Sequence, residues 1–131
     1  MREIKIVSSK RNEMIDITSD IKKIIIDEKI KNGLLIAYVP HTTAAITINE
    51  GADPDVKRDI IKNLENLIPE SGNYLHAEGN SDAHIKSSLI GPSINVIIND
   101  GGLVLGTWQH IFFYEGDGPR TRKVFLEIIS K

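Results

Sequence analysis

The chain has 131 residues, of which 26% are charged, and a formal net charge of −2, so it lacks the broad basic surface that binds a nucleic-acid backbone. It contains no cysteine, which excludes disulfides and thiolate chemistry and leaves imidazole and oxygen as the available metal ligands. No apolar run reaches the ~20 residues of a membrane helix or resembles a signal peptide, so we expect a single cytoplasmic domain, residues 1–131, without membrane contact.

The first thirty residues predict a β-hairpin followed by a helix. Apolar residues alternate over 2–8 and again over 13–17, with a polar turn between them. Isoleucines then recur at helical spacing, from a hydroxyl cap at 18–19 to about Asn32, and Gly33 would end this helix.

Two strands and a second helix are expected next. The run 34–39 is continuously apolar, as in a strand covered on both faces, and the proline after it ends the strand. Residues 43–48 alternate and would return as its antiparallel partner. Asp53 and Pro54 form a helix start, an N-cap followed by a first-turn proline, and this helix would end before Pro69.

The rest of the chain predicts a short helix over 80–91 and three further strands. These strands are expected over 94–98, over the long run 103–115, in which Gly106 would mark a bulge, and over 120–129. Past Gly106 the side chains alternate between two faces of the strand, with Trp108, His110, Phe112 and Tyr114 on one and Gln109, Ile111 and Phe113 on the other. Strands in hairpins with three intervening helices indicate an α+β domain with a mostly antiparallel sheet, sandwich or barrel-like.

Three histidines stand where ligands are often assembled. His41 follows a strand exit, His76 lies on a loop, and His84 falls in the first turn of the helix that Asn80 or Ser81 begins. As neutral imidazoles they would hold a divalent metal, with a carboxylate as a further ligand, an orienting partner or a proton acceptor. The candidate carboxylates are Glu50, Glu78 and Asp82. The alternative is that each histidine caps a loop or bonds to backbone.

A second group of residues suits a phosphorylated substrate. Arg120, Thr121 and Arg122 follow a glycine-rich turn and could hold a phosphate, since guanidinium binds phosphate through two hydrogen bonds; a solvated strand end with ion pairs is the alternative. Further hydroxyl candidates, close to a histidine along the chain or on its helix face, are Thr42, Thr43 and Ser88. Trp108 and Gln109 could position a heteroaromatic ring, although a core tryptophan is the simpler interpretation.

Three blocks of this sequence resemble the YjbQ-like family of secondary thiamine-phosphate synthases. The blocks are HTTAAITINEGADPDV at 41–56, HAEGNSDAHIKSSLIGPS at 76–93 and LGTWQHIFFYEGDGPRTRKV at 105–124. The resemblance covers essentially the whole chain. It implies a compact α+β fold, a homotrimer with the site near subunit contacts, and a divalent metal on His41, His76 and His84.

The resemblance also implies a weak thiamine-phosphate synthase activity, which joins a pyrimidine methyl diphosphate to a thiazole phosphate and releases pyrophosphate. This reaction needs positioning and electrostatic stabilisation of the leaving group, for which we expect Arg120 and a metal, zinc as purified or magnesium. Glu50 or Asp82 would orient a histidine or a metal-bound water. A metal-dependent hydrolase of a small phosphate compound and a non-catalytic binder of metal and small anions are the alternatives.

Overall fold

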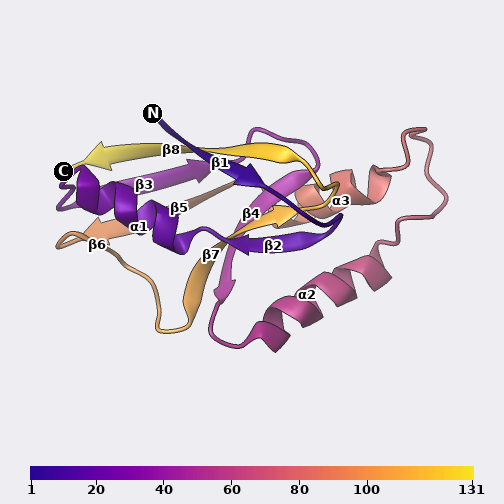
Figure 1. Ribbon diagram of the computed structural model, residues 1–131, viewed down its shortest axis with the longest axis horizontal. Coiled ribbons are helices and arrows are strands. Elements are labelled where there is room, and N and C mark those ends of the chain that lie inside the picture. The colour runs from indigo at the N-terminus through magenta and orange to yellow at the C-terminus, as the bar shows by residue number, and fades with distance from the viewer.

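The computed structural model describes residues 1–131 as two antiparallel sheets with three helices, which confirms the α+β prediction (Figure 1). The five-stranded sheet has the order β1 (Arg2–Val7), β8 (Thr121–Ser130), β3 (Gly33–Tyr38), β5 (Ser93–Asn99), β6 (Gly102–Leu103). The three-stranded sheet has the order β2 (Glu13–Asp16), β7 (Gln109–Glu115), β4 (Ala44–Glu50). The helices are α1 (Thr18–Asp27), α2 (Pro54–Leu67) and α3 (Ser81–Ile90). None of them has the length and apolarity needed to cross a membrane.

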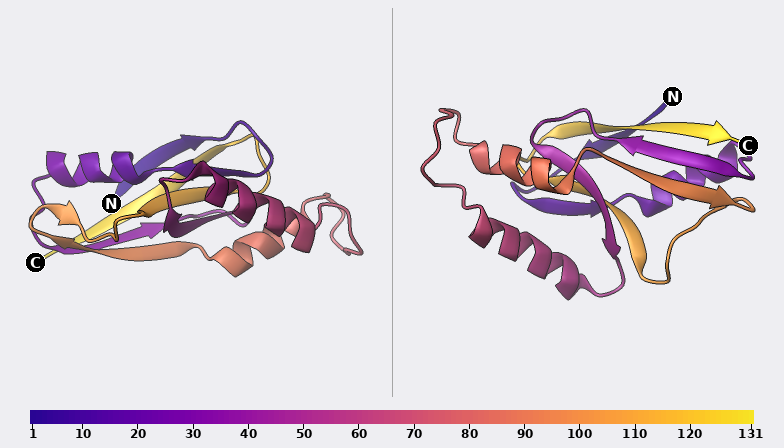
Figure 2. Two further views of the ribbon diagram at one scale, coloured as in Figure 1. Left: turned by 90° about the horizontal axis from the view of Figure 1, so that it is seen from below. Right: turned by 180° about the vertical axis from the view of Figure 1, so that it is seen from behind.

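The main core lies between the two sheets. It joins side chains such as Leu35 and Leu126 of the five-stranded sheet to Phe113 of the three-stranded one, and α1 adds Ile21 and Ile25 at one end. Figure 2 shows α1 at that end of the sheets and α2 and α3 at the other. The two helices that flank the candidate histidines are therefore remote from α1.

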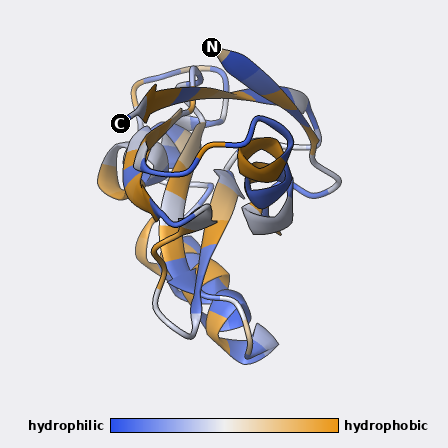
Figure 3. Cartoon of the chain, turned by 90° about the vertical axis from the view of Figure 1, so that its left-hand side faces the viewer, coloured by the Kyte–Doolittle hydropathy of each residue, from blue (hydrophilic) through white to orange (hydrophobic).

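The predicted alternation of side chains along β7 is confirmed, and each face of the strand packs in a different hydrophobic cluster. Phe113 points into the main core, whereas Phe112 and Tyr114 join Met14 and Ala45 in a second, smaller cluster on the opposite face. The helix α2 interleaves hydrophobic and hydrophilic residues (Figure 3). Its hydrophobic side chains are partly buried and pack against this second cluster. Those side chains are Ile60, Ile61 and Leu64.

The helix boundaries follow local capping chemistry. The predicted start of α2 is confirmed, because the Asp53 carboxylate accepts a 2.9 Å hydrogen bond from the Asp55 N–H. In α1 the cap prediction was wrong: the Asp16 carboxylate accepts from the Thr18 N–H, while the Thr18 hydroxyl accepts from the backbone of Ile111. This helix also ends at Asp27, earlier than predicted, because the chain turns through a left-handed residue at Lys29 before it enters β3.

Several predicted strand partnerships were wrong. The strands β1 and β2 do not form a hairpin, since β1 pairs with β8 and β2 pairs with β7. Likewise β3 and β4 lie in different sheets, and the long run 103–115 divides into β6 and β7, with Gly106 in the connecting loop instead of a bulge. In each case the chain crosses from one sheet to the other between the two strands. An alternating pattern shows only that each strand buries one face, so it does not reveal which strand is its partner.

The crossing after β1 depends on a close backbone approach at Gly118. A Cβ at this position would lie 2.2 Å from the Lys10 carbonyl oxygen, which leaves no room for a side chain. The Gly118 N–H donates to the Arg11 carbonyl, so the turn before β8 and the loop after β1 are held together. This contact places the turn beside the start of α3.

The outer face of the five-stranded sheet is uncovered in the single chain, contrary to the prediction that β3 is covered on both faces. Leu35 of β3 is fully buried, but Leu34 is only partly so. Leu34 lies between Ile97 and Ile129 in the register, and these two isoleucines are 60% and 56% exposed. An apolar row therefore crosses the open face of this sheet.

Candidate functional site

A polar cavity of about 480 Å³ lies where the end of β3, the start of α3 and the turn before β8 meet. Apart from one proline, every side chain that lines it is polar or charged. The lining residues are Pro40, His41, Thr42, Thr43, His76, Glu78, Asn80, His84, Asp117, Arg120 and Arg122. We call this cavity the His–Arg pocket.

The pocket is held together by a hydrogen bond between its two flanking segments. The Asn80 side-chain amide, at the start of α3, donates to the Asp117 carboxylate at 2.8 Å. Asp117 also accepts from the guanidinium of Arg120 at 2.9 Å, so it links the helix to the arginine. The turn before β8 thereby fixes one wall of the pocket against α3.

The imidazoles of His76 and His84 lie at a separation that fits a shared metal ion. Their ring centroids are 5.3 Å apart and their planes are nearly perpendicular. Two imidazoles bound to one tetrahedral metal would have centroids roughly 5 Å apart, given metal–nitrogen bonds of about 2 Å. The donor chemistry and the spacing of this pair therefore both suit a divalent cation.

His41 lines the same pocket, but one of its ring nitrogens is already bonded to the backbone. Its Nε2 accepts a 3.0 Å hydrogen bond from the Lys123 N–H. Burial lowers the pKa of His41, and the positive charge of Arg122 lowers it further, so the ring is neutral at pH 7. In that tautomer Nδ1 carries the proton and is a donor. No cluster of three histidine or carboxylate side chains stands ready to hold a metal in this arrangement.

Arg122 is committed to the protein interior. Its guanidinium binds the fully buried Glu115 through two hydrogen bonds, of 2.9 and 2.5 Å, and donates to the Thr43 hydroxyl at 2.8 Å. Burial alone would raise the pKa of Glu115, but the hydrogen bonds from Arg122, Ser8 and the Asp117 N–H outweigh it and hold that pKa below its usual range. The charge of Arg122 is thus neutralised inside the chain.

Arg120 is the more accessible of the two arginines. It precedes β8, is half exposed, and uses Nε and Nη2 to bind the backbone carbonyl and carboxylate of Asp117. Its Nη1 makes no hydrogen bond within the chain. Thr121, by contrast, is exposed and does not line the pocket.

Positive and negative side chains balance one another in the lining of the pocket. Leaving the imidazoles aside, Arg120 and Arg122 contribute +2, and the carboxylates of Glu78 and Asp117 contribute −2, so these lining residues carry no net charge. A divalent cation would change this local charge to +2. Phosphate groups would therefore be attracted once a cation is bound.

Comparison with known proteins decides the family. The family model described as "UPF0047 protein YjbQ-like" matches residues 2–131 of the chain. The chain belongs to the YjbQ-like UPF0047 family. It is 58% identical to a UPF0047 protein of Methanocaldococcus jannaschii over 125 residues, which cover 95% of this chain and 91% of that protein. It is 46% identical to the UPF0047 protein YugU of Bacillus subtilis, with 99% of both chains covered.

Solved structures of YjbQ-like proteins share the fold. A YjbQ/UPF0047 protein of Clostridium acetobutylicum is 52% identical and superposes with a TM-score of 0.96, covering 98% of this chain and 100% of that one. A protein of Aeropyrum pernix is 36% identical with a TM-score of 0.95, covering 99% and 98% of the two chains. The predicted family and the α+β class are thus both confirmed.

Three of the predicted site residues lie far from the His–Arg pocket of this YjbQ-like chain. In the register of β4 and β7, Glu50 opposes Gln109 whereas Ala44 opposes Glu115, and six residues of strand separate these positions by about 20 Å. Trp108 is 61% exposed and shares a surface hollow with Glu50, and the Gln109 side chain accepts from the Gly106 N–H. A single chain therefore does not bring Glu50, Trp108 or Gln109 to the histidines.

Two further predicted residues, Asp82 and Ser88, lie in α3 and bond to neighbouring groups of the protein. Asp82 is fully buried and does not line the pocket, because its carboxylate accepts from Arg11 at 3.0 Å and from Lys86 at 3.1 Å. The Ser88 hydroxyl donates to the His84 carbonyl at 2.9 Å, and Ser88 borders a smaller hollow with His41 and His84. Asp82 thus positions the helix that carries His84. Ser88 lies on the same helix face as His84, as predicted.

Sequence reasoning missed Asn80, Asp117 and Glu115 as parts of the site. Asn80 was interpreted as a helix cap and Asp117 as a turn residue, both of which are ordinary positions for these side chains. Glu115 gave no signal beyond its place at the end of a strand. Their roles depend on hydrogen bonds between distant segments, such as Asn80 with Asp117, 37 residues apart.

Proposed function

We propose that this YjbQ-like protein is a thiamine-phosphate synthase-like transferase that works in the His–Arg pocket with a divalent metal, zinc as purified or magnesium. One observation carries the proposal: a polar cavity combines two imidazoles at a separation that suits a shared metal, those of His76 and His84, with the guanidinium of Arg120, whose Nη1 makes no hydrogen bond within the chain. The thiazole nitrogen would attack the pyrimidine methylene, the carbon–oxygen bond would break, and pyrophosphate would leave with the electron pair.

The residues of the pocket would stabilise the leaving pyrophosphate. Arg120 would donate through Nη1, and His41 through its Nδ1–H. The Thr43 hydroxyl accepts from Arg122, so its own hydrogen stays available for a phosphate oxygen. A bound metal would supply the positive charge that the pocket itself lacks, with His76 and His84 as its ligands.

A metal-dependent hydrolase is the second candidate, favoured by the composition of the pocket wall. Pro40 is the one apolar side chain that lines the cavity, so the cavity itself offers little apolar surface for a pyrimidine or thiazole ring. A hydrolase needs only the phosphate and a water molecule. Hydrolysis would release phosphate without the thiazole substrate, whereas the synthase would form product only when both substrates are present.

Metal content tests the pocket directly. We expect about one divalent metal ion per chain in the untagged protein, and loss of that ion when His84 is replaced by Ala, because an imidazole ligand is removed. His110→Ala is the matched control, since His110 lies outside the pocket and bonds to Asp16. Elemental analysis of the three folded proteins measures the outcome. A full metal complement in His84→Ala would contradict the proposed site.

We also propose that the protein is a homotrimer in which neighbouring copies cover the apolar row of the five-stranded sheet. Ile97→Glu should therefore shift the protein to smaller species in sedimentation velocity, because it would bury an unpaired charge in the contact. Leu67→Glu on α2, where the side chain is 74% exposed, is the control that should leave the assembly unchanged. An unaltered sedimentation coefficient for Ile97→Glu would rule out this face.

A further inference from the structure

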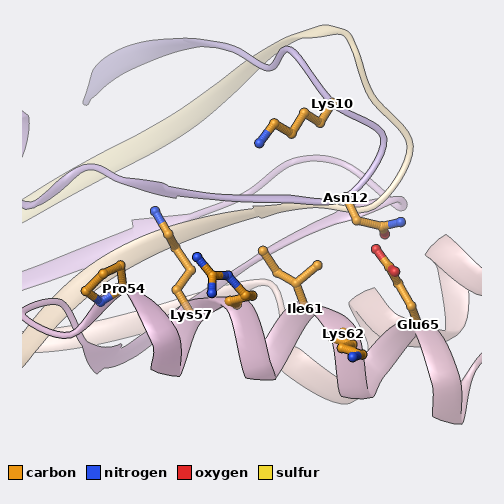
Figure 4. A pocket seen from close by; sticks show the side chains of 8 residues that line it. Lys10, Asn12, Pro54, Lys57, Ile61, Lys62 and Glu65 are labelled. Carbon is orange, nitrogen blue, oxygen red and sulfur yellow. The ribbon is translucent and has the colours of Figure 1, made fainter.

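A second cavity, of about 440 Å³, lies between α2 and the loop that follows β1. Its lining residues are Lys10, Asn12, Pro54, Lys57, Arg58, Ile61, Lys62 and Glu65, none of which lines the His–Arg pocket. We call it the basic cavity. Figure 4 shows Lys10 extending from the loop and Lys57 rising from the facing helix, with Asn12 and Glu65 at the other end.

The basic cavity concentrates positive charge in a chain that is acidic overall. Four cationic side chains face one carboxylate, that of Glu65, so the lining carries a net charge of +3, whereas the whole chain carries −2. Of the four cations only Arg58 has an ion-pair partner, Asp55, at 3.1 Å on the exposed helix surface. Lys10, Lys57 and Lys62 form no ion pair. The charge of these three lysines is therefore not neutralised by an ion pair within the protein.

We infer that the basic cavity binds a small multivalent oxyanion, one that carries two or more phosphate or carboxylate groups. With Arg58 paired to Asp55, the three lysines and Glu65 leave a charge of +2, which is balanced by such a ligand and not by a single monovalent ion. The ammonium groups supply rotatable donors on flexible stems, and the planar guanidinium of Arg58 can bind an oxyanion through two hydrogen bonds.

The size and surroundings of the cavity favour a small ligand over a nucleic acid. Its volume lies within the usual range for small-molecule sites, roughly 300–1,000 Å³. A nucleic-acid backbone needs a basic surface that extends well beyond one cavity, and the negative net charge of the chain does not provide one. Ile61 offers the ligand one apolar contact.

Titration calorimetry with pyrophosphate, at a fixed ionic strength, tests the inference. We expect Lys10→Gln/Lys57→Gln to bind about tenfold more weakly or worse than the unaltered protein, because two charge-assisted contacts are lost. Lys22→Gln/Lys23→Gln is the matched control: it removes the same charge from the exposed side of α1 and should leave the affinity within about twofold, since distant charges are screened. Thermal melting confirms that each variant is folded.

Arg120→Gln separates the basic cavity from the His–Arg pocket, so failure of this inference and failure of the proposed function give different results. Unchanged pyrophosphate binding in Arg120→Gln, with loss in Lys10→Gln/Lys57→Gln, supports the inference. Loss only in Arg120→Gln would assign the anion to the His–Arg pocket and overturn it. Equal losses in the two lysine pairs, or no binding to the unaltered protein, would overturn it as well.

Discussion

Replacing Glu115 by Gln is expected to destabilise the protein by about 3–5 kcal/mol, because the buried guanidinium of Arg122 loses its counter-charge. Glu115 is fully buried and Arg122 is 5% exposed, so water cannot take over the role of the carboxylate. Glu115 also accepts from Ser8 and from the Asp117 N–H, and the variant weakens the turn beside the His–Arg pocket. Urea denaturation measures the change in the free energy of unfolding.

The same variant should change how stability depends on pH. The folded protein holds the pKa of Glu115 below its usual value, so the carboxylate adds stability that is fully present above the unfolded pKa of about 4.3. This contribution is lost as the pH falls through the lower, folded pKa. Glu115→Gln has no such proton to bind, so its free energy of unfolding should fall less steeply below about pH 5 than that of the unaltered protein.

Glu127→Gln is the matched control for Glu115→Gln. Glu127 lies on β8, the strand that also carries Arg122, but its side chain is 55% exposed, and its replacement should cost less than about 0.5 kcal/mol. If Glu115→Gln were as stable as this control, the buried ion pair would not be needed to hold the two sheets together at the pocket.

Replacing Asp82 by Ala should also cost about 3–5 kcal/mol, because it leaves the charge of Lys86 buried without a counter-charge, with only the Asn12 side-chain oxygen as a partner. Lys86 is 1% exposed and its ammonium lies 3.1 Å from the Asp82 carboxylate; Arg11 binds the other oxygen of that carboxylate. The variant should also lose metal, because α3 carries His84. Denaturation and elemental analysis of the same sample measure both effects.

A paired replacement separates positioning from catalysis. Asp82→Leu/Lys86→Met exchanges the buried ion pair for apolar side chains of similar size and should recover most of the lost stability, because neither charge is left unpaired. If Asp82 only positions α3, this double variant should also regain metal binding. A stable double variant that binds metal but has no activity would instead return Asp82 to the catalytic role predicted from the sequence.

The candidate site was predicted correctly where each residue is placed by its immediate neighbours. Asn80 and Gly91 flank α3 as expected, so His84 falls in its first turn, and His76 lies on the loop before it. Caps and helical periodicity depend on residues only a few positions apart, which a single sequence shows directly. His41 likewise follows the end of β3 as the apolar run predicts.

The roles assigned to acidic and aromatic residues depended on distances that the sequence does not contain. Glu50 and Trp108 are close in sequence to other candidate site residues. They lie at the far ends of β4 and β7, however, and six residues of extended strand place them about 20 Å from the histidines. Asp82 is close to His84 in sequence, but the same helix turns its carboxylate inward, where Arg11 and Lys86 bind it.

The sequence by itself determined the fold class, the family, the ends of α2 and α3, and the two faces of β7, because these follow from local periodicity, capping and extended blocks of similarity. Only the tertiary structure decided which strands pair, which arginine is buried, and that Asn80 and Asp117 join the pocket. Many of those features depend on contacts between distant segments, such as Asn80 with Asp117, 37 residues apart, or β1 with β8 at the two ends of the chain, whose partners are chosen by the packing of the whole chain.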